Sequence, residues 1–436
     1  MKKLNFIFFA SNLHDNASVL NSRQPLMEGI KKFAEINIVY PSTLSSGQKL
    51  DKFIDGARKN PSGGLSHTSD CKTVCFIGTG GTEEMFRSTL PMLPEHIILL
   101  SDGFHNSFAA SLEIKTFLTQ KGISCDLYNA PLDYSPEFFT TLEEALFSES
   151  GSADTAQITT EEPQFTKSAL KALEKKKIGL IGGASPWLIS SDIDRDYVQN
   201  TYKVEFIDIA ISELENAYEQ VSDDNREASD IVNSMERFLV ADRSREDLEK
   251  AARLYVALNA ICKKYGLDAM TIKCFDILAS TGTTACLALG LLNDHGIVAG
   301  CEGDIPTLWT MIYAQTMFGK KAFMANPSSS SAAEQTIDFA HCTIPMTMLH
   351  GYRLPSHFES QIGIGIAGSV PSGEYRLIKI SGSKLDRMYS VIGDIIMNTN
   401  VPQRCRTQIR FKFRSKEDFD SFTKASKGNH IVLIPA

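Results

Sequence analysis

The sequence lacks any apolar run of the roughly 18 residues that a membrane-spanning helix needs. It also lacks an excess of basic residues, because 44 Lys and Arg stand against 52 Asp and Glu, which gives a net charge of -8 at pH 7. Nucleic-acid-binding proteins usually carry a basic patch, so we expect neither nucleic acid nor a membrane as a partner. The apolar start at residues 4–10 is short and interrupted by Asn5, without a clear cleavage site after it. We therefore interpret it as a first strand rather than a signal peptide.

The cysteines lack the paired spacing of a zinc site. Cys71 and Cys75 lie close together, but no second pair with such spacing follows them. Most of the nine cysteines, such as Cys274 and Cys286, lie inside apolar runs. This setting is typical of small buried side chains in a reducing compartment. We therefore predict a cytoplasmic protein.

The fingerprints of nucleotide-binding folds are missing as well. The glycine-rich run at 78–82 follows an apolar stretch at 73–77, but it has neither the glycine spacing of a dinucleotide fold nor the Gly-Lys-Ser/Thr ending of a phosphate loop. Glycines between a strand and a helix still let backbone amides approach a polar ligand. The run therefore indicates a ligand contact rather than a nucleotide site.

What the sequence does contain is a repeated alternation of short apolar runs with helical patterns, which predicts parallel sheets covered by helices on both faces. The apolar runs lie at 4–10, 36–40, 73–77, 97–100 and 125–128, and again at 177–181, 204–208, 269–274 and 296–300. Between these two sets, residues 148–166 are rich in Ser, Thr, Glu, Gly and Ala, which is typical of a connection. The stretch 56–64 has the composition of a flexible segment.

One helix is specified in detail by its ends. Ser244 and Asp247 have the spacing of a capping box, apolar residues recur along one face, and Gly266 follows Lys263 and Lys264 in the last turn. This pattern predicts a helix over 245–265.

The last part of the chain has a different pattern. Alternating apolar and polar residues at 375–380 and 408–413 predict half-buried strands with few helices between them. We therefore predict an α/β protein with two Rossmann-like doubly wound domains, at 1–166 and 167–320, followed by a C-terminal antiparallel β-domain at 321–436, a small barrel.

The stretch 301–304 combines two carboxylates with a tight turn. It follows a buried apolar run and precedes a proline-started helix, so Glu302 and Asp304 lie at the carboxyl end of a parallel-type strand. Open α/β sheets bind their ligands at that edge. Downstream polar residues add amide and imidazole groups that suit a divalent metal, namely Asn326, His341, His350 and His357. The alternative is that the two carboxylates only cap the next helix or stay solvated.

In this order, the stretches resemble the L-fucose isomerase and L-arabinose isomerase superfamily, and most of all its fucose-isomerase-like branch. The resemblance covers most of the chain and is strongest over 272–368. The motifs that carry it are Lys273-Cys274-Phe275-Asp276, Cys301-Glu302-Gly303-Asp304-Ile305, His341-Cys342-Thr343 and Ser356-His357-Phe358-Glu359-Ser360. It implies an active site between the second and third domains. It also implies a homo-oligomer, a trimer or hexamer, whose sites are completed by a neighbouring N-terminal domain.

The resemblance further implies a metal-dependent aldose–ketose isomerase with Mn²⁺ or another divalent cation. Glu302 would be a metal ligand and acid/base group, His357 a second ligand, and His341 a further candidate. Asn326 stands where a second carboxylate ligand is expected, and the serine run at 328–331 after it is unusual for a ligand loop. An amide adds no negative charge and cannot act as a base. Either Asp304 supplies the missing carboxylate, or the proton transfer differs, or isomerase activity is absent.

Aldose–ketose exchange through an enediol needs a base beside the C1–C2 edge and charge stabilisation at O1 and O2. We predict Glu302 as the base with Asp304 as its partner, and His350 as structural. The substrate-binding candidates are Lys273, Trp187, His105 and Asn106. For each a structural alternative stays open, namely a solvated lysine, a domain-interface tryptophan, or a solvated loop.

The predicted function is therefore isomerisation of a free monosaccharide, fucose-like or arabinose-like. One alternative is an isomerase of a modified or charged sugar, with Asn326 reflecting an altered site. The other is a sugar-binding or regulatory protein that keeps the fold without the catalysis, since two consecutive α/β domains resemble the halves of binding proteins.

Overall fold

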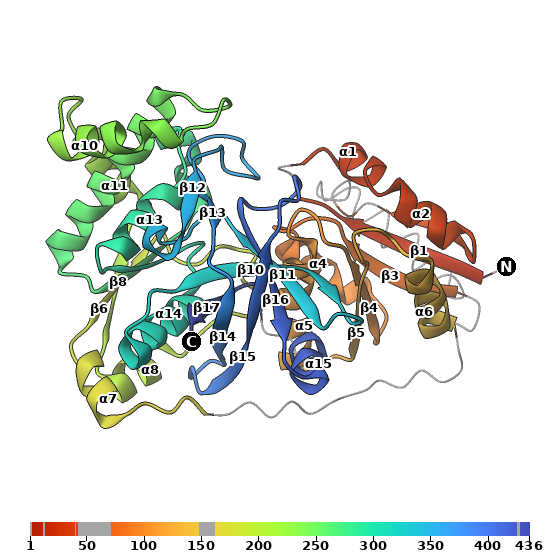
Figure 1. Cartoon of the computed structure of the whole chain (residues 1–436). Coiled ribbons are helices and arrows are strands. Elements are labelled where there is room, and N and C mark those ends of the chain that lie inside the picture. Colours follow the sequence, from red (N-terminus) through yellow and green to blue (C-terminus); the bar gives the residue numbers. More distant parts are fainter. Residues whose placement is uncertain (1, 12–13, 40, 42–70, 148–161, 425–427) are drawn as a thin grey trace. The chain divides into compact units, whose positions relative to one another are not determined.

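The computed structural model of the protein describes residues 2–11, 14–39, 41, 71–147, 162–424 and 428–436 (Figure 1). The stretch 56–64 and most of the connection at 148–166 lie outside these residues. The chain divides into two compact units. The first unit comprises Met1–Ile158, Pro327–Ala333 and Asp420–Asn429, and the second comprises Thr159–Asn326, Glu334–Phe419 and His430–Ala436. The domain boundaries expected from the sequence stay predictions.

The first unit is built on a five-stranded parallel sheet in the order β2-β1-β3-β4-β5. Its strands are β1 (Lys2–Phe9), β2 (Ala34–Val39), β3 (Cys71–Ile77), β4 (Ile97–Ser101) and β5 (Cys125–Asn129). Its helices are α1 (Asn16–Asn21), α2 (Gln24–Lys31), α4 (Glu83–Thr89), α5 (Ser107–Gln120) and α6 (Pro136–Phe147). This strand order has its topological switch point between β1 and β3.

Alternation along β1 explains why helices cover both faces of this sheet. Phe6 and Phe8 point to one face, where they join a buried cluster with Leu26 of α2 and Leu142 of α6. Helices α4 and α5 contact each other, and α5 contacts β3, β4 and β5. Because the strands are buried on both sides, their sequences are nearly continuous apolar runs.

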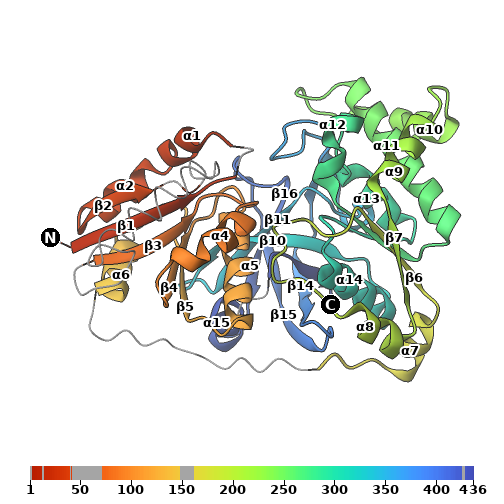
Figure 2. The same ribbon diagram turned by 180° about the vertical axis from the view of Figure 1, so that it is seen from behind.

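The second unit begins with a four-stranded sheet in the order β7-β6-β8-β9, again all parallel. Its strands are β6 (Lys177–Ile181), β7 (Glu205–Ile209), β8 (Ala269–Ile272) and β9 (Val298–Gly300). Its helices are α7 (Lys167–Leu173), α8 (Arg195–Tyr202), α9 (Ile211–Glu219), α10 (Arg226–Met235), α11 (Arg245–Tyr265), α12 (Leu278–Thr281), α13 (Cys286–Asp294) and α14 (Ile305–Phe318). Helix α11 contacts α9, α10 and α13, and Figure 2 shows these helices together.

A closed barrel completes this part of the fold, with the strand order β10-β11-β16-β15-β14-β17. Its strands are β10 (Phe323–Ser331), β11 (Thr336–His341), β14 (Gly373–Ser381), β15 (Arg387–Asn398), β16 (Thr407–Phe413) and β17 (Ile431–Pro435). A two-stranded sheet of β12 (Gly351–Arg353) and β13 (Ala367–Ser369) and the helix α15 (Lys416–Lys424) accompany it. The predicted fold class, two parallel α/β sheets followed by an antiparallel barrel, is confirmed.

Helix α14 connects the second sheet with the barrel. It contacts β8 and β9 on the sheet and β14 and β17 on the barrel. Figure 1 shows α14 beside β14 and β17. Its sequence is apolar around most of its circumference, and nine consecutive residues from Pro306 to Ala314 are buried. A helix that is apolar all round is a core helix. The turn at 301–304, which precedes α14, is therefore fixed next to both the second sheet and the barrel.

Among the described residues, no single helix combines the length and the apolar character needed to cross a membrane. The bent pair Cys274–Thr281 and Cys286–Asp294 meets the length and composition criteria only when its two helices are taken together.

Candidate functional site

The candidate site is built on the turn that follows β9. Glu302 and Gly303 both adopt left-handed backbone conformations, with φ of 62° and 72°. A Cβ atom on Gly303 would lie 2.2 Å from the carbonyl oxygen of Gly183, so only glycine fits there. A left-handed glutamate costs roughly 1–2 kcal/mol. Such strain persists where the surroundings enforce it, often at functional sites.

Neighbouring strand ends hold this turn in place. The hydroxyl of Thr271 on β8 donates to the carbonyl of Cys301 at 3.2 Å and accepts from the amide of Gly303 at 3.1 Å. The amide of Ser185, which follows β6, donates to the carbonyl of Glu302 at 3.0 Å. The loops after β6, β8 and β9 therefore meet at the carboxyl edge of the sheet, where the sequence placed the ligand site.

The carboxylate of Glu302 has two polar neighbours from distant parts of the chain. Trp187 Nε1 donates to its Oε2 at 2.5 Å, and His430 Nε2 lies 3.5 Å from its Oε1. Burial alone would raise the pKa of Glu302, but the charge of His430 and the hydrogen bonds from His430 and Trp187 lower it. Glu302 is therefore a carboxylate at neutral pH, and 14% of its side chain remains exposed.

His430 lies between two carboxylates. Its ring is fully buried, and Nδ1 is 2.9 Å from Oδ2 of Asp304. Burial would lower the pKa of His430, but the charges of Glu302 and Asp304 and the hydrogen bonds to them raise it to about 9. The ring therefore carries a positive charge at neutral pH and balances the two carboxylates.

Asp304 is fully buried and has several contacts within the protein. It is the N-cap of α14, where Oδ1 accepts from the amide of Thr307 at 2.8 Å and Oδ2 accepts from its hydroxyl at 2.7 Å. Lys379 Nζ donates to the same hydroxyl at 2.9 Å and lies 4.0 Å from Oδ2. Burial would raise the pKa of Asp304, but Lys379 and His430 lower it well below its usual value. The capping alternative from the sequence thus describes part of what Asp304 does.

Three side chains of the described chain offer metal-type ligand atoms close together. Atoms of Cys301, Glu302 and His341 lie within 4.8 Å of one another. The sulfur of Cys301 also lies 3.3 Å from that of Cys274. Nδ1 of His341 accepts the amide of Thr343 at 3.0 Å. Because that nitrogen accepts, the neutral ring has its proton on Nε2 and donates from there.

A divalent cation needs ligands whose other polar contacts hold them in place. A metal-binding histidine usually donates its other ring N–H to a carboxylate, which fixes the ring orientation. His430 has this arrangement, since Nδ1 pairs with Asp304 while Nε2 points towards Glu302. The group that could hold a divalent cation is thus Cys301, Glu302 and His341, and His430 adjoins it through Glu302 and could add a ligand only by giving up its Nε2 proton.

Two other predicted ligands lie in the second unit outside the group of three. Asn326 is buried within β10, so it belongs to a barrel strand rather than to a loop. His357 accepts at Nδ1 from the amide of Ser360 and shares a 2.9 Å hydrogen bond with its hydroxyl. Its ring contacts Phe275 edge-on, with the centroids 5.7 Å apart. Its role stays a prediction.

The predicted sugar-binding residues of the second unit have partners within the protein. Lys273 follows β8 and pairs with Asp276 at 2.8 Å, with a quarter of its side chain exposed. The indole of Trp187 packs edge-on against Phe275, with centroids 5.2 Å apart. Trp187 therefore orients Glu302 directly, which the sequence did not indicate.

The remaining two candidates, His105 and Asn106, belong to the first unit. They follow β4 and have left-handed φ values of 52° and 57°. Asn106 is the residue before α5, but its side chain makes no capping hydrogen bond to that helix. Nδ1 of His105 lies 3.1 Å from Nη2 of Arg23.

Sequence reasoning missed His430, Cys301 and Lys379. His430 comes after the long barrel segment and directly before the apolar run of β17. A polar residue at the start of a buried strand was a usable signal, but only the barrel topology brings it to Glu302. Lys379 belongs to a strand with alternating polar and apolar residues. The alternation alone does not show that the Lys379 side chain points towards Asp304.

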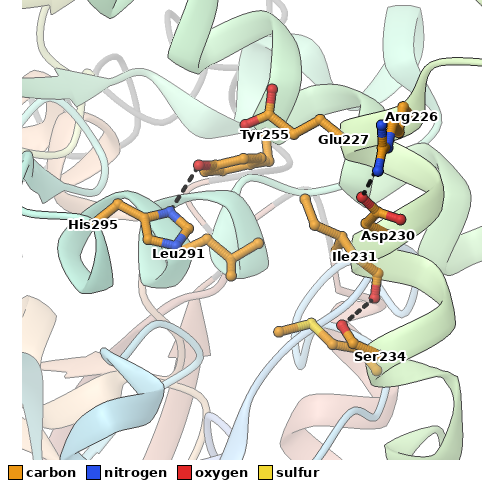
Figure 3. Close-up of a pocket in the computed structure, with 9 residues that line it drawn as sticks. Arg226, Glu227, Asp230, Ile231, Ser234, Tyr255, Leu291 and His295 are labelled. Atoms are coloured by element: carbon orange, nitrogen blue, oxygen red, sulfur yellow. Dashed lines mark hydrogen bonds and ion pairs between the residues drawn. The ribbon is translucent and has the colours of Figure 1, made fainter.

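A cavity of about 550 Å³ lies elsewhere in the second unit (Figure 3). One face of α10 lines it together with Tyr255, Leu291 and His295, and the Tyr255 hydroxyl lies 2.7 Å from Nδ1 of His295. His295 precedes β9 whereas Glu302 follows it. The cavity therefore belongs to the opposite edge of the sheet from the candidate site.

No protein-family model matches the chain. The sulfoquinovose isomerase of Clostridium sp. (strain MSTE9) is 27% identical to it over 164 residues, which are 33% of this chain and 37% of that isomerase. The match thus spans little more than a third of the relative's length. A structure of A-type ketoreductases from a modular polyketide synthase covers 69% of this chain and 78% of its own, at 10% identity. Its TM-score of 0.25 is too low to indicate a shared fold.

The partial similarity to a sugar isomerase is compatible with the superfamily that the sequence motifs resemble.

Proposed function

We propose that the protein is an aldose–ketose isomerase whose base is Glu302. The observation that carries the proposal is a single side chain: a strained, largely buried glutamate at the carboxyl edge of a parallel sheet, kept ionised by His430 and oriented by Trp187. The partial similarity to a sulfoquinovose isomerase supports the same reaction class.

In the proposed mechanism, Glu302 removes the proton from the carbon next to the sugar carbonyl and returns it to the neighbouring carbon. Proton transfer by a positioned carboxylate contributes about 10²–10⁴-fold to the rate. The bond from Trp187 Nε1 at 2.5 Å holds Oε2, so the proton is proposed to go to Oε1, which lies 3.5 Å from His430 Nε2. His341, with its proton on Nε2, donates to a sugar oxygen on which charge develops.

A divalent cation, Mn²⁺ or another, would polarise the sugar carbonyl and fix the orientation of O1 and O2 when bound. Glu302 and His430 are the residues proposed to hold it, with Asn326 and His357 as candidates for further positions. His341 is a further candidate that would bind through Nε2 in place of its proton, instead of donating to the sugar. Asp304 acts through His430, because it holds the ring with Nε2 towards Glu302. It is therefore a positioning residue in this proposal, rather than a second base.

The substrate proposed first is a free monosaccharide related to fucose or arabinose. The name of the partial relative favours a second candidate, a hexose that carries a sulfonate group. Lys273 is the candidate cation for such a group, since it follows β8 at the same sheet edge and a quarter of its side chain, which pairs with Asp276, is exposed. A homo-oligomer, a trimer or hexamer, and a cytoplasmic location complete the proposal.

The test is exchange of solvent deuterium into C1 or C2 of the sugar. L-fucose, L-arabinose and sulfoquinovose are incubated with protein that has been treated with a chelator and reconstituted with Mn²⁺. Glu302→Gln should abolish exchange, because an amide cannot take the proton. Glu246→Gln, at a position on α11 where 74% of the side chain is exposed, is the matched control and should leave exchange unchanged.

The proposal fails if none of these sugars exchanges a proton, or if Glu302→Gln exchanges as fast as the control. Sugar binding without exchange would instead support a non-catalytic sugar-binding protein on the same fold.

A further inference from the structure

Two buried thiols lie next to each other at the carboxyl edge of the second sheet. Sγ of Cys301 donates to Sγ of Cys274 at 3.3 Å, and the two residues are 4% and 8% exposed. A disulfide bond is about 2.05 Å long, so the two cysteines are free thiols in this structure. The sulfur atoms need to approach by about 1.3 Å to form a disulfide.

The backbone brings the two cysteines together from neighbouring strands. Thr271 on β8 pairs with Gly300 on β9, and each cysteine comes within two residues of the end of its strand. Adjacent strands lie about 4.8 Å apart, and disulfides join Cα atoms that are about 4.4–6.8 Å apart. Cys274 begins the 3₁₀ helix η4 (Cys274–Ile277), a type of helix with poorer hydrogen-bond geometry than an α-helix. We therefore expect the movement that closes the bond to occur mainly on the side of Cys274.

The pair lies close to solvent on the side of Cys274. Lys273 and Asp276, which stand on either side of this cysteine in the sequence, have 25% and 43% of their side chains exposed. Cys274 itself is more exposed than Cys301. A small oxidant such as hydrogen peroxide, which is similar in size to water, needs no large opening to reach a sulfur there. Cys274 is therefore the sulfur that such an oxidant meets first.

Both cysteines are directly connected to contacts of the proposed base. Phe275 follows Cys274, and Glu302 follows Cys301 in the left-handed turn. Trp187 contacts both of these residues, because its Nε1 donates to Glu302 and its ring packs edge-on against Phe275. A disulfide would therefore change the position of Glu302 relative to Trp187. It would also remove the Cys301 sulfur from the candidate metal group, since the thiolate is the form of cysteine that binds metals.

We propose that Cys274 and Cys301 are a redox modification site, which hydrogen peroxide converts into a reversible disulfide. The sulfur of Cys274 attacks one peroxide oxygen and the O–O bond breaks. The departing oxygen takes the thiol proton and leaves as water, and Cys274 becomes a sulfenic acid. The sulfur of Cys301 then attacks the Cys274 sulfur, the S–O bond breaks, and the oxygen leaves as water with the proton of the Cys301 thiol. Two thiols and one hydrogen peroxide thus give one disulfide and two waters.

The first experiment detects the bond without metal or sugar. The full-length protein is treated with hydrogen peroxide, its remaining thiols are alkylated, and it is digested without reductant by a protease that cuts before aspartate. Cleavage at Asp276 and Asp294 places Cys274, Cys286 and Cys301 in three different peptides. Mass spectrometry should find the first and third joined, and dithiothreitol should separate them as it is oxidised to its cyclic disulfide. Absence of the joined peptides, or pairing of Cys301 with Cys286 instead, would overturn the proposal.

Variants of Cys274 then test which sulfur is the partner of Cys301. Cys274→Ser and Cys274→Ala both remove the sulfur and keep a small side chain, so the test stands even where one of them folds poorly. In both variants Cys301 should stay a free thiol after the same treatment. Cys262→Ala, which removes a buried thiol of α11, is the matched control and should form the disulfide like the wild type. Loss of the disulfide in this control as well would contradict a specific pair.

The fluorescence of Trp187 tests whether the disulfide affects the site. The chain has two tryptophans, so Trp187 is the only one left in a Trp309→Phe background. Because Trp187 contacts Glu302 and Phe275, its emission should change on oxidation and return with dithiothreitol. The emission of Cys274→Ser in the same background should stay constant. An emission that does not respond to a disulfide detected by mass spectrometry would refute the connection to Glu302.

The expected effect on activity rests on the proposed function, whereas the disulfide itself does not. A misplacement of about 1 Å can cost about 100-fold in rate, so deuterium exchange, assayed after the peroxide is removed, should fall about 100-fold and recover with dithiothreitol. Cys274→Ser should exchange equally fast before and after peroxide. Exchange that is unaffected by the disulfide would refute its control of Glu302. If no sugar exchanges even in the reduced protein, the proposed function fails, while the joined peptides still establish the redox site.

Discussion

At the scale of single residues, Asp304 combines two contacts that would usually need two side chains. Its Oδ1 caps α14 through the amide of Thr307, while Oδ2 holds His430 and faces Lys379. Asp304→Asn keeps the capping oxygen but removes the negative charge between two buried cations. Leaving buried charges without a partner costs about 3–5 kcal/mol.

We therefore expect Asp304→Asn to lower the free energy of unfolding by about 3 kcal/mol, measured by urea denaturation. The matched control is Asp194→Asn, at the exposed N-cap of α8 where the side chain accepts from Tyr197. Asn and Asp cap helices about equally well, so the control should change stability by only a few tenths of a kcal/mol. Equal stability of the two variants would contradict a stabilising role for the charge of Asp304 beside His430 and Lys379.

Trp187 offers a second test at this scale. The chain has two tryptophans, so the other one can serve as the matched control. Trp187→Phe keeps an aromatic ring against Phe275 and removes the donor to Glu302. A misplaced base reacts more slowly, so we expect kcat of the proposed isomerisation to fall roughly 10–100-fold with KM little changed. The control is Trp309→Phe, since Trp309 is 1% exposed among Tyr202 and Phe165 in the core.

Trp309→Phe should affect stability but leave kcat within about twofold, because its ring does not touch the reacting groups. If both variants lost the same activity, the indole of Trp187 would have no specific role in orienting Glu302.

At the scale of elements, α11 shows what local sequence determines. The structure has this helix at Arg245–Tyr265 with Ser244 and Asp247 bonded reciprocally and Gly266 at a φ of 64°. All of these were predicted, since a cap depends on residues within one turn. Ser244→Ala should therefore cost about 1 kcal/mol of unfolding free energy in urea denaturation. Metal binding and exchange should be unchanged, and a loss of either would contradict a purely local role.

Contacts between residues far apart in the chain could not be predicted from the sequence. Both parallel sheets could be predicted from the alternation of strands and helices, because each strand is an apolar run with a turn at its end. The same pattern predicted that Glu302 lies at the carboxyl edge of the second sheet. His430 could not be paired with Glu302, because their approach depends on how β17 closes the barrel. Asn326 lies in the strand β10, which was not predicted as a strand from the sequence. Such contacts are set by register, which the polar and apolar pattern does not determine alone.

The barrel contains a buried charge cluster that makes its stability depend on pH. Asp338 on β11 pairs with Arg410, its register partner on β16, at 2.7 Å and with Arg404 at 2.8 Å. Burial would raise the pKa of Asp338, but the two arginines lower it below its usual value. A carboxyl with a lowered folded-state pKa stabilises the protein above its unfolded pKa of about 3.9. That stability is lost as the pH falls through the folded-state pKa.

We expect Asp338→Asn to destabilise the protein at pH 7 and to differ less from the wild type below about pH 4. Urea denaturation at pH 7, 5 and 3 gives this difference directly. Asp394→Asn is the control, because Asp394 pairs with Arg414 on the surface with 39% of its side chain exposed. Its effect should stay below about 1 kcal/mol at every pH. A pH-independent difference for Asp338→Asn would exclude the ion pair as its cause.

At the scale of the whole molecule, the two α/β sheets share the same strand order over four strands. Their orders, β2-β1-β3-β4 and β7-β6-β8-β9, place a switch point at the same position in each. Both carry left-handed non-glycine residues beyond a strand, His105 in the first unit and Glu302 in the second. The carboxylate at the first edge, Asp102, is fully buried and paired with Arg23, whereas 14% of the Glu302 side chain at the second edge is exposed. The proposed proton transfer is therefore expected at the second edge.

If the proposed oligomer completes each site with the first unit of a neighbouring subunit, a mixed oligomer can recover activity that neither parent has. Glu302→Gln removes the proposed base, and His105→Asn removes the imidazole predicted to bind the sugar while keeping an acceptor for Arg23. The two inactive or weakened variants are unfolded together, refolded and assayed for deuterium exchange. With random mixing of subunits, about a quarter of the shared sites contain both wild-type residues. Exchange should therefore rise to about a quarter of the wild-type rate, and each variant refolded alone is the control. A mixture no more active than the average of its parents would show that Glu302 and His105 do not serve one site across subunits.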